Sequence, residues 1–388
     1  MIYLDYVSAT PMDSKVFAAM KPYFSNIFYN PSAAYGAARE AKADFEEARH
    51  KIAQTIGAKP AEIIMTAGAT ESINLAFNII TVDSQKTNNV SDRIITTSIE
   101  HPAVLEVAKA RGATILPVDK NGRINVDELQ TKITDETELV SIGYANNEIG
   151  TVQPIKEVAK NITEIRLDRL ERGIKTPLLF HTDASQAAGL LDINVARLGI
   201  DLMTLNAGKC YGPKQVGLLY ARAGIGLKPL IFGGGQEYGL RSGTENVAGA
   251  IGFAKALEIT EKKRKSETKR LAYLRDDIEK FIRKEFSSAL INGNKKYSLS
   301  NLINISFPGL DGERLLFALD QCGVQVATGS ACAANKGTRS HVLTAIGLSD
   351  DQADGSIRIS MGRDTTVFEI GEFKHALIGV VESEKNLV

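Results

Sequence analysis

The chain has 388 residues, roughly two to three times the size of a common single domain, so we expect a large core and a second domain. Its 46 basic residues balance 46 acidic ones, which argues against direct binding to nucleic acid or another polyanion. No apolar stretch approaches the length of a membrane span, and the N-terminus lacks the pattern of a signal peptide. We therefore expect a cytoplasmic protein with no membrane attachment.

Apolar runs of strand length alternate with helical patterns, which is typical of a parallel α/β sheet. Their continuous apolar character favours strands covered on both faces by helices. We predict strands over Glu62–Thr66, Arg93–Ser98, Leu139–Tyr144, Leu178–His181, Leu202–Leu205 and Val216–Tyr220.

Helical periodicity marks Glu40–Ile56, Ala103–Arg111 and, most clearly, Val247–Phe286. Within the last segment, the basic run EKKRKSETKR (261–270) is interpreted as a solvated helix face, because acidic residues soon follow it. Beyond Phe286, strands mix with short helices. We predict a large domain over residues 14–260 and a small α+β domain made of residues 1–13 and 261–388.

Polar clusters follow five of the predicted strands. They are AGATES after residue 66, IEHPA after 98, NNEIG after 144, TDASQ after 181 and NAGK after 205. In parallel α/β sheets, ligands lie beyond the carboxyl ends of the strands. We therefore expect the five clusters to converge on one pocket.

The contents of these clusters indicate the kind of ligand. Ala69 and Thr70 open a helix, where backbone N–H groups and a hydroxyl can bind a phosphate. Asp183 can pair with a protonated ring nitrogen, and Lys209 can form a Schiff base with an aldehyde. A phosphate, a pyridinium ring and an aldehyde together describe pyridoxal 5′-phosphate (PLP). The five scattered histidines lack metal-ligand spacing, so no metal site is expected.

Other residues of the clusters suit the same ligand, although each has an ordinary alternative. His101 can stack on the ring and move protons, while Asn147 and Gln186 can hydrogen-bond the ring hydroxyl. Alternatively, Lys209 is a surface lysine, His101 caps the following helix, and Asp183 is a turn residue. The order and spacing of these residues favour the PLP site over the separate alternatives.

The chain resembles the NifS/IscS-like cysteine desulfurases, which are PLP-dependent enzymes of the class V aminotransferase family. The resemblance runs from YLDYVSATP near the N-terminus to RISMGRDTT near the C-terminus. Its most specific motifs are GATESINLA, EHPAVLE, NNEIGTVQPI, DASQAAG, GKCYGPKQVG, LRSGTENVAG and GSACAANKGTRSHVL. It implies the fold type I of PLP enzymes, with a mainly parallel sheet flanked by helices in the large domain and a smaller α+β domain.

The resemblance also implies roles for individual residues. Lys209 is the Schiff-base lysine, Asp183 binds the ring nitrogen and His101 stacks on the ring. Gln186 and Asn147 lie near the ring oxygen, Thr70 binds the phosphate, and Arg358 with Asn147 binds the substrate carboxylate. Ala69 and Asn206 are two further residues that we predict to bind the cofactor. Thr244 reaches the phosphate from a second subunit, so a homodimer is implied.

The three cysteines are widely spaced and favour reduced thiols over a disulfide. Cys332 lies in a small, polar stretch that predicts a mobile loop over about residues 327–340. Cys322 is expected at a helix end or in the core, and Cys210 is expected to be an inert neighbour of Lys209. Desulfuration needs a thiolate that reaches the substrate sulfur and then carries it away, so we assign Cys332 as the catalytic thiol.

The expected reaction converts L-cysteine to L-alanine, with Lys209 removing the α-proton and Cys332 taking the sulfur as a persulfide. The sulfur then passes to an acceptor protein, for iron–sulfur cluster assembly or tRNA thiolation. A related PLP enzyme, such as a selenocysteine lyase or an aminotransferase, is one alternative. A scaffold subunit without activity is another.

Several residues depart from the family pattern. Asn206 and Gly208 stand where a serine and a histidine usually donate to the cofactor phosphate, and the run YVSATP varies the usual alanine-threonine run. Tyr35 and Tyr238 also replace a usual histidine and arginine. We hypothesise that Asn206, Thr70, Thr244 and backbone N–H groups keep the phosphate bound.

Overall fold

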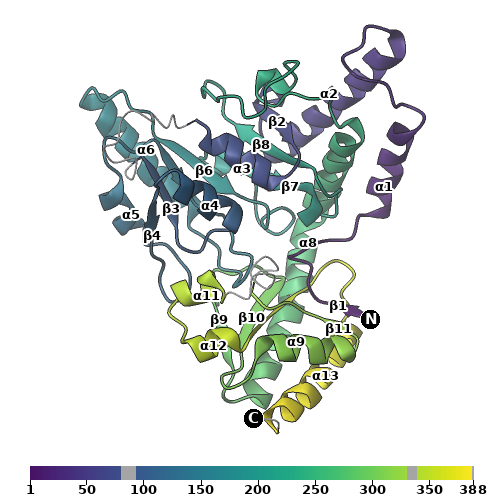
Figure 1. The fold of residues 1–388 in the computed structure, drawn as a ribbon, viewed down its shortest axis with the longest axis vertical. Coiled ribbons are helices and arrows are strands. Elements are labelled where there is room, and N and C mark those ends of the chain that lie inside the picture. Colours follow the sequence, from purple (N-terminus) through teal and green to yellow (C-terminus); the bar gives the residue numbers. More distant parts are fainter. Residues whose placement is uncertain (80–92, 330–338, 387–388) are drawn as a thin grey trace.

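A seven-stranded sheet forms the centre of the larger part of the molecule (Figure 1). This computed structural model describes residues 1–79, 93–329 and 339–386. In spatial order the strands are β2 (Ile63–Thr66), β8 (Gly217–Ala221), β7 (Leu202–Asn206), β6 (Leu179–Asp183), β5 (Leu139–Ser141), β3 (Ile94–Thr97) and β4 (Thr114–Leu116). Strand β8 runs antiparallel to β2 and β7, and the other neighbours are parallel.

The sheet confirms all six predicted strands, with small shifts at their ends. The prediction missed β4, a strand of three residues at the edge of the sheet. Its middle residue Ile115 is 38% exposed, so β4 lacks the continuous burial that marks the central strands.

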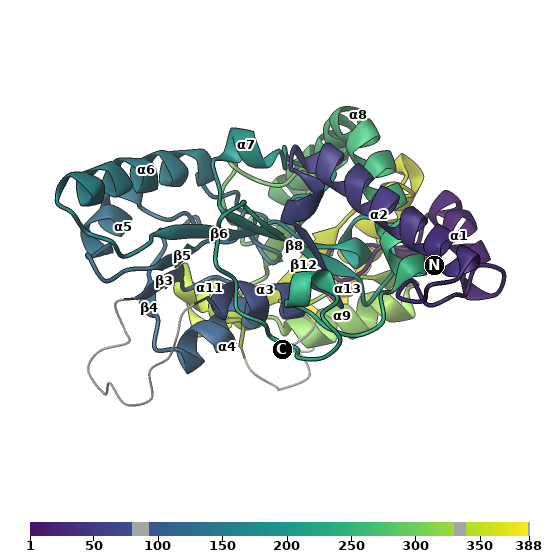
Figure 2. The same ribbon diagram turned by 90° about the horizontal axis from the view of Figure 1, so that it is seen from above.

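Helices cover both faces of this sheet (Figure 2). On one face lie α3 (Ala69–Phe77) and α4 (Pro102–Ala110), and on the other lie α2 (Gly36–Ile56), α6 (Ile155–Glu171), α7 (Val195–Leu198) and part of α8 (Val247–Glu285). The remaining helices of this part are α1 (Ser14–Met20) and α5 (Val126–Lys132). The three predicted helices correspond to α2, α4 and α8 and are confirmed.

Helix α2 illustrates how the sequence specifies these elements. Phe45, Ile52 and Ile56 recur at helical spacing on its buried face. The helix ends at Gly57, whose φ of 73° is a left-handed conformation that glycine adopts without a steric penalty.

A smaller part lies below the large sheet in Figure 1. It contains the three-stranded antiparallel sheet of β9 (Leu290–Asn292), β10 (Leu302–Ser306) and β12 (Ser356–Ser360), and the parallel pair of β1 (Ile2–Tyr3) and β11 (Val324–Gln325). Its helices are α9 (Gly312–Gln321), α11 (His341–Ala345), α12 (Asp350–Asp354) and α13 (Val367–Lys385).

Helix α8 spans both parts. Its buried residues up to Leu257 belong to the core beneath the large sheet, and those from Leu271 onward pack into a second core with β10, β12 and α13. The change from one core to the other brackets the predicted boundary at residues 260 and 261, although the division into domains stays a prediction.

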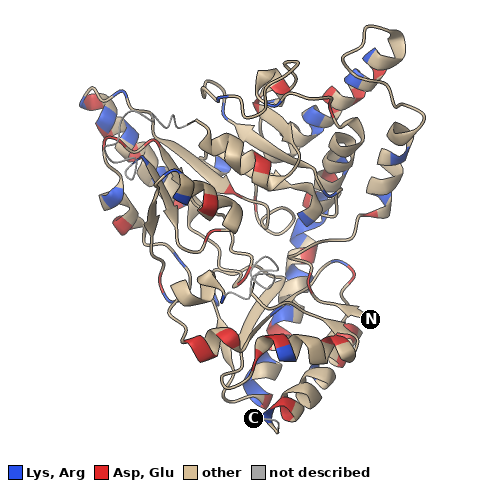
Figure 3. Cartoon of the chain, in the orientation of Figure 1, with Lys and Arg blue, Asp and Glu red and all other residues tan. Residues whose placement is uncertain are grey.

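Charged residues of both signs are interspersed over the molecule (Figure 3). The run 261–270 follows this pattern, since Arg264 pairs with Glu261 and Arg270 with Glu267 along the same helix. Among the described residues, no helix combines the length and apolar character needed to cross a membrane.

Candidate active site

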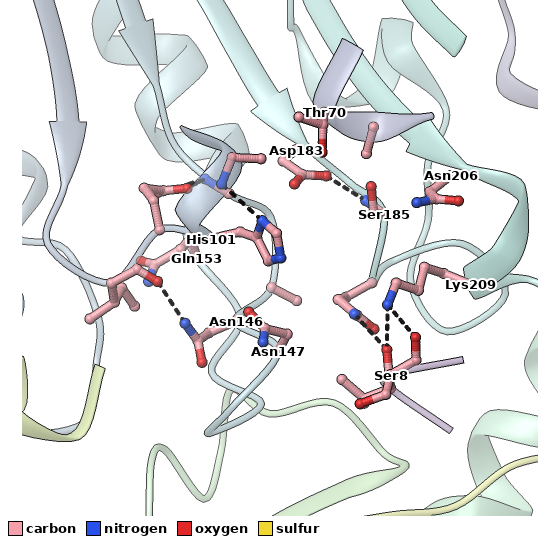
Figure 4. Close-up of a pocket in the computed structure, with 18 of the residues that line it drawn as sticks. Ser8, Thr70, His101, Asn146, Asn147, Gln153, Asp183, Ser185, Asn206 and Lys209 are labelled. Atoms are coloured by element: carbon pink, nitrogen blue, oxygen red, sulfur yellow. Dashed lines mark hydrogen bonds between the residues drawn. The ribbon is translucent and has the colours of Figure 1, made fainter. Parts of the chain in front are cut away.

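A pocket of about 300 Å³ opens at the carboxyl ends of the parallel strands (Figure 4). This volume is at the lower end of the range for small-molecule sites. Strands β2, β3, β5, β6 and β7 run in one direction, and residues from all five polar clusters line the pocket, so the predicted convergence is confirmed. The predicted site residues that line it are Ala69, Thr70, His101, Asn147, Asp183, Gln186, Asn206, Lys209 and Arg358.

Lys209 enters the pocket from a tight turn after β7. The side chain of Asn206 caps this turn, because its Oδ1 accepts from the backbone N–H of Gly208 at 3.0 Å. The Lys209 Nζ donates to the backbone oxygens of Val7 at 2.8 Å and Ser8 at 2.7 Å. The N-terminal segment therefore holds the amine at the pocket wall (Figure 4).

Asp183 ends β6, and one of its carboxylate oxygens accepts from the backbone N–H of Ser185 at 2.9 Å. The expected turn role is thus real, and the second oxygen is left for a ligand. Two residues earlier on the same face, His181 is fully buried between the hydroxyls of Ser141 at 2.8 Å and Thr204 at 3.0 Å. Burial lowers the pKa of His181 to about 4, so this ring beneath Asp183 is neutral.

His101 caps α4, as the simpler alternative expected, and it also faces the pocket. Its Nδ1 accepts from the backbone N–H of Ala103 at 3.1 Å. In the neutral ring the proton is therefore on Nε2. Loss of bulk water around the ring lowers the pKa of His101, which keeps it neutral and able to donate from Nε2.

Glu100 is a buried carboxyl group at the pocket that sequence reasoning missed. It accepts from the Thr97 hydroxyl at 2.6 Å and from the backbone N–H of Gly143 at 2.9 Å. Burial, assisted by the charge of Asp183, raises its pKa to about 7 despite these donors. The sequence indicated its neighbour His101, because a histidine can exchange protons near neutral pH. A single glutamate after a strand has no pattern that distinguishes it from a surface residue.

The N-terminus of α3 offers a place for a phosphate. Gly68 precedes the helix with a φ of 143° and leaves the helix without a side-chain cap. The first N–H groups therefore point from Ala69 and Thr70 toward the pocket that these residues line. The backbone of Gly68 packs closely against β8 at Gly217, where only glycine fits, since a Cβ at Gly217 would lie 2.6 Å from the Gly68 carbonyl carbon.

Gly208 has room for a side chain. A Cβ at this position would lie 3.4 Å from Asn206 Oδ1 and 3.7 Å from Lys214 Cγ, which are ordinary contacts. The backbone conformation is not one that requires glycine, because its φ is not positive. The absence of a histidine at 208 is thus not imposed by packing around the Cβ.

Arg358 is 1% exposed and is not the surface cation that its charge suggests. Its Nη2 donates to Asp5 Oδ1 at 2.7 Å and to the Ser8 hydroxyl at 2.8 Å, and its Nη1 donates to the backbone oxygen of Asn147 at 3.1 Å. Its Nε is buried and has no hydrogen-bond partner. A buried guanidinium at a pocket suits an anionic ligand group.

The other predicted residues lie elsewhere. Thr244 is exposed and does not line the pocket of its own chain, and Cys332 lies outside the described residues. Cys210 is completely buried, and burial raises the pKa of its thiol to about 12, which agrees with the expectation that it is an inert neighbour of Lys209. Cys322 is exposed at the end of α9, so it is the helix-end thiol and not a core residue.

The residues of the pocket fit PLP. An uncapped helix N-terminus, a carboxylate at a strand end and a lysine amine held at the wall lie around one cavity, with an imidazole across from the lysine (Figure 4). Among the described residues, no group of three or more side chains is arranged to hold a metal ion.

Comparison with known proteins agrees with this geometry. The family model described as aminotransferase class-V matches residues 2–373. This chain belongs to that family. Its group within the family is the cysteine desulfurases, which are PLP-dependent.

Relatives and solved structures match over nearly the whole chain. The chain is 41% identical to "Cysteine desulfurase IscS" of Dictyoglomus turgidum, covering 100% of this chain and 96% of the relative. It is 38% identical to "Cysteine desulfurase IscS 1" of Archaeoglobus fulgidus, covering 100% and 98%. A solved "NifS-like protein" superposes with a TM-score of 0.89 at 34% identity, covering 98% and 99%, and "SspA in complex with cysteine" with a TM-score of 0.77 at 35% identity, covering 93% and 99%.

Proposed function

We propose that this class V family member takes sulfur from L-cysteine and delivers it to a protein acceptor. In the overall step, L-cysteine and the Cys332 thiol give L-alanine and a Cys332 persulfide. The carbon–sulfur bond of the substrate breaks and a sulfur–sulfur bond to Cys332 forms. One of the two thiol hydrogens is transferred, in net terms, to the β-carbon, which becomes the methyl group of alanine, and the other stays on the persulfide. The two electrons that reduce the β-carbon come from the sulfur atoms that join. No external oxidant or reductant is needed.

The observation that carries the proposal is the grouping of Lys209, Asp183 and His101 with Arg358 around one pocket. Lys209, held by two backbone carbonyls, supplies an amine that takes the α-proton. Arg358 orients the substrate through its carboxylate. His101 carries a proton on Nε2 and exchanges it with the reacting groups.

Asp183, the N-terminus of α3 and Lys209 would hold PLP at its ring nitrogen, its phosphate and its aldehyde. Asn206 would add its amide N–H to the phosphate, and Gln186 and Asn147 lie on the same pocket. When bound, PLP withdraws electrons from the substrate α-carbon and so makes its proton acidic.

A homodimer completes the proposed site. Thr244 is exposed in one chain and lies outside that chain's own pocket, which suits a residue that acts on the phosphate of a partner subunit. We also propose a cytoplasmic location and an acceptor protein that serves iron–sulfur cluster assembly or tRNA thiolation.

The test compares the wild type with Cys332→Ala. Both proteins should show the visible absorbance of lysine-bound PLP, removable by borohydride, while only the wild type should form alanine from L-cysteine. Normal turnover by Cys332→Ala would overturn the assignment of the thiol. Activity with selenocysteine and not with cysteine would instead support a selenocysteine lyase, and a protein without the absorbance would support a scaffold.

A further inference from the structure

Ser8 joins the two cations of the site. Its backbone oxygen accepts from Lys209 Nζ at 2.7 Å, and its hydroxyl accepts from Arg358 Nη2 at 2.8 Å. The residue lines the pocket and belongs to YVSATP, the run that varies from the family pattern. The proposed reaction assigns no role to this hydroxyl.

The hydrogen bonds of Arg358 limit how it can bind a carboxylate. Both Nη2 hydrogens are engaged, one by Asp5 and one by Ser8, and one Nη1 hydrogen is engaged by the Asn147 backbone. A carboxylate that uses the Nη1–Nη2 fork would have to displace Asp5 or Ser8. Only one Nη1 hydrogen and the buried Nε hydrogen remain beyond these contacts.

Ser8 can supply a donor in addition to the two hydrogens that remain on Arg358. A serine hydroxyl has one hydrogen to donate besides the lone pairs with which it accepts. Because its oxygen already accepts from a guanidinium, the O–H is polarised and becomes a better donor to an anion. Its oxygen is 2.8 Å from Nη2, so a carboxylate at the edge of Arg358 lies within its reach.

The backbone around Ser8 fixes this position. The Val7 N–H donates to the Ser360 hydroxyl at 3.1 Å, and the Ser8 N–H donates to the Asp5 carbonyl at 3.1 Å. On the other side, the Thr10 N–H donates to the Gly208 carbonyl at 3.2 Å. The hydroxyl is thus held between β12 and the turn that carries Lys209.

We propose that Ser8 is a further substrate-binding residue, whose hydroxyl donates to the substrate α-carboxylate beside Arg358. This inference rests on the proposed function, because it takes an α-amino acid as the ligand. It assigns to Ser8 a share in the selection of amino acids over amines that lack a carboxylate.

The experiment measures ligand binding in holoenzyme with Cys332→Ala, where no turnover is expected. Dissociation constants for L-cysteine and for cysteamine, the same thiol amine without the carboxylate, are obtained from the change in the visible absorbance. Ser8→Ala should weaken L-cysteine binding by about tenfold, the loss expected for one hydrogen bond to a charged group, and leave cysteamine binding unchanged.

Two further measurements keep the test sharp. Ser8→Thr retains the hydroxyl and should recover most of the affinity for L-cysteine. An equal loss for both ligands, or no loss for either, would overturn the proposal. Alanine formation by the wild type is assayed separately, and its absence would contradict the desulfurase proposal. The ratio of the dissociation constants for L-cysteine and cysteamine would still test the role of Ser8.

Discussion

Two regions build the pocket in different ways. The carboxyl ends of five strands each contribute a short polar cluster, which overlaps the end of its strand or begins within five residues of it. The N-terminal segment of residues 4–10 contributes by crossing from β1 in the small part to the turn before Lys209 in the large part. One region acts through side chains with recognisable chemistry, and the other acts through two backbone oxygens, the Asp5 carboxylate and the Ser8 hydroxyl.

This difference shows why strand-end residues are easier to assign than crossing segments. A strand end has a direction that the topology dictates, so its cluster can be placed from the sequence alone. A crossing segment acquires its role only from the residues it happens to meet, here Lys209 and Arg358.

The largest effect is expected within the strand-end region, where two neighbours should behave oppositely. Lys209→Ala should lower turnover by a factor of about 10³ or more, because it removes the side chain that we propose as both the covalent anchor and the base. Cys210→Ala should keep turnover near the wild-type value, since its thiol is buried and protonated. Steady-state alanine formation measures both, and a dead Cys210→Ala protein that still binds PLP would contradict the division.

The N-terminal segment is tested by Asp5→Ala. This change leaves the Arg358 guanidinium buried without its ion-pair partner, so the free energy of unfolding should fall by about 3 kcal/mol in urea titrations. The control is Asp135→Ala, which breaks an exposed pair with Arg172 and should leave stability near the wild-type value. Equal losses of unfolding free energy in the two variants would contradict a stabilising role for the ion pair between Asp5 and the buried Arg358.

Below the strand ends, His181 should make stability depend on pH. Its pKa is lowered in the folded state to about 4 from an ordinary 6.5, so the unfolded chain binds more protons between these values. The contribution of His181 to the free energy of unfolding is therefore fully present above pH 6.5 and is lost as the pH falls. Between pH 7.5 and pH 5 this loss is about 2 kcal/mol.

His181→Gln should reduce that loss by the same amount when unfolding is measured at both pH values. The overall slope will not vanish, because partial desolvation of the His101 ring at the pocket also lowers the pKa of that residue. A slope equal to that of the wild type would show that His181 is not held neutral by its surroundings.

The smallest effect concerns Gly208, where the strand-end region departs from the family. Gly208→His adds a donor where a Cβ meets only ordinary contacts, so PLP affinity should rise by about tenfold. Equilibrium dialysis of PLP against the wild type and the variant measures this. An unchanged affinity would mean that Asn206 and the N–H groups of α3 already satisfy the phosphate.

Most of the fold and much of the site were predictable. The six expected strands and three expected helices are present, because continuous apolar runs and helical spacing report burial locally. The exposed edge strand β4 was missed for the same reason. Nine predicted site residues line one pocket, but their chemical roles stay predictions, as does the role of Cys332 outside the described residues.

The residues that prediction missed act through long-range contacts. Glu100 matters because Gly143 and Thr97 hold it in a dry environment near Asp183, and Ser8 matters because Lys209 and Arg358 bond to it from 201 and 350 residues away. Neither residue type carries a pattern of its own. Patterns of residue spacing along the sequence do not predict hydrogen bonds of this kind.

By itself, the sequence determined the α/β architecture and the cluster of polar residues beyond the strands, because these follow from local periodicity and from the common direction of parallel strands. The family followed from the resemblance of its motifs. Only the tertiary structure decided which polar atoms meet. It buried Arg358, gave two of its donors to Asp5 and Ser8, and fixed the proton of His101 on Nε2. The physical reason is that hydrogen bonds and desolvation depend on distances between residues far apart in the chain, which local pattern does not specify.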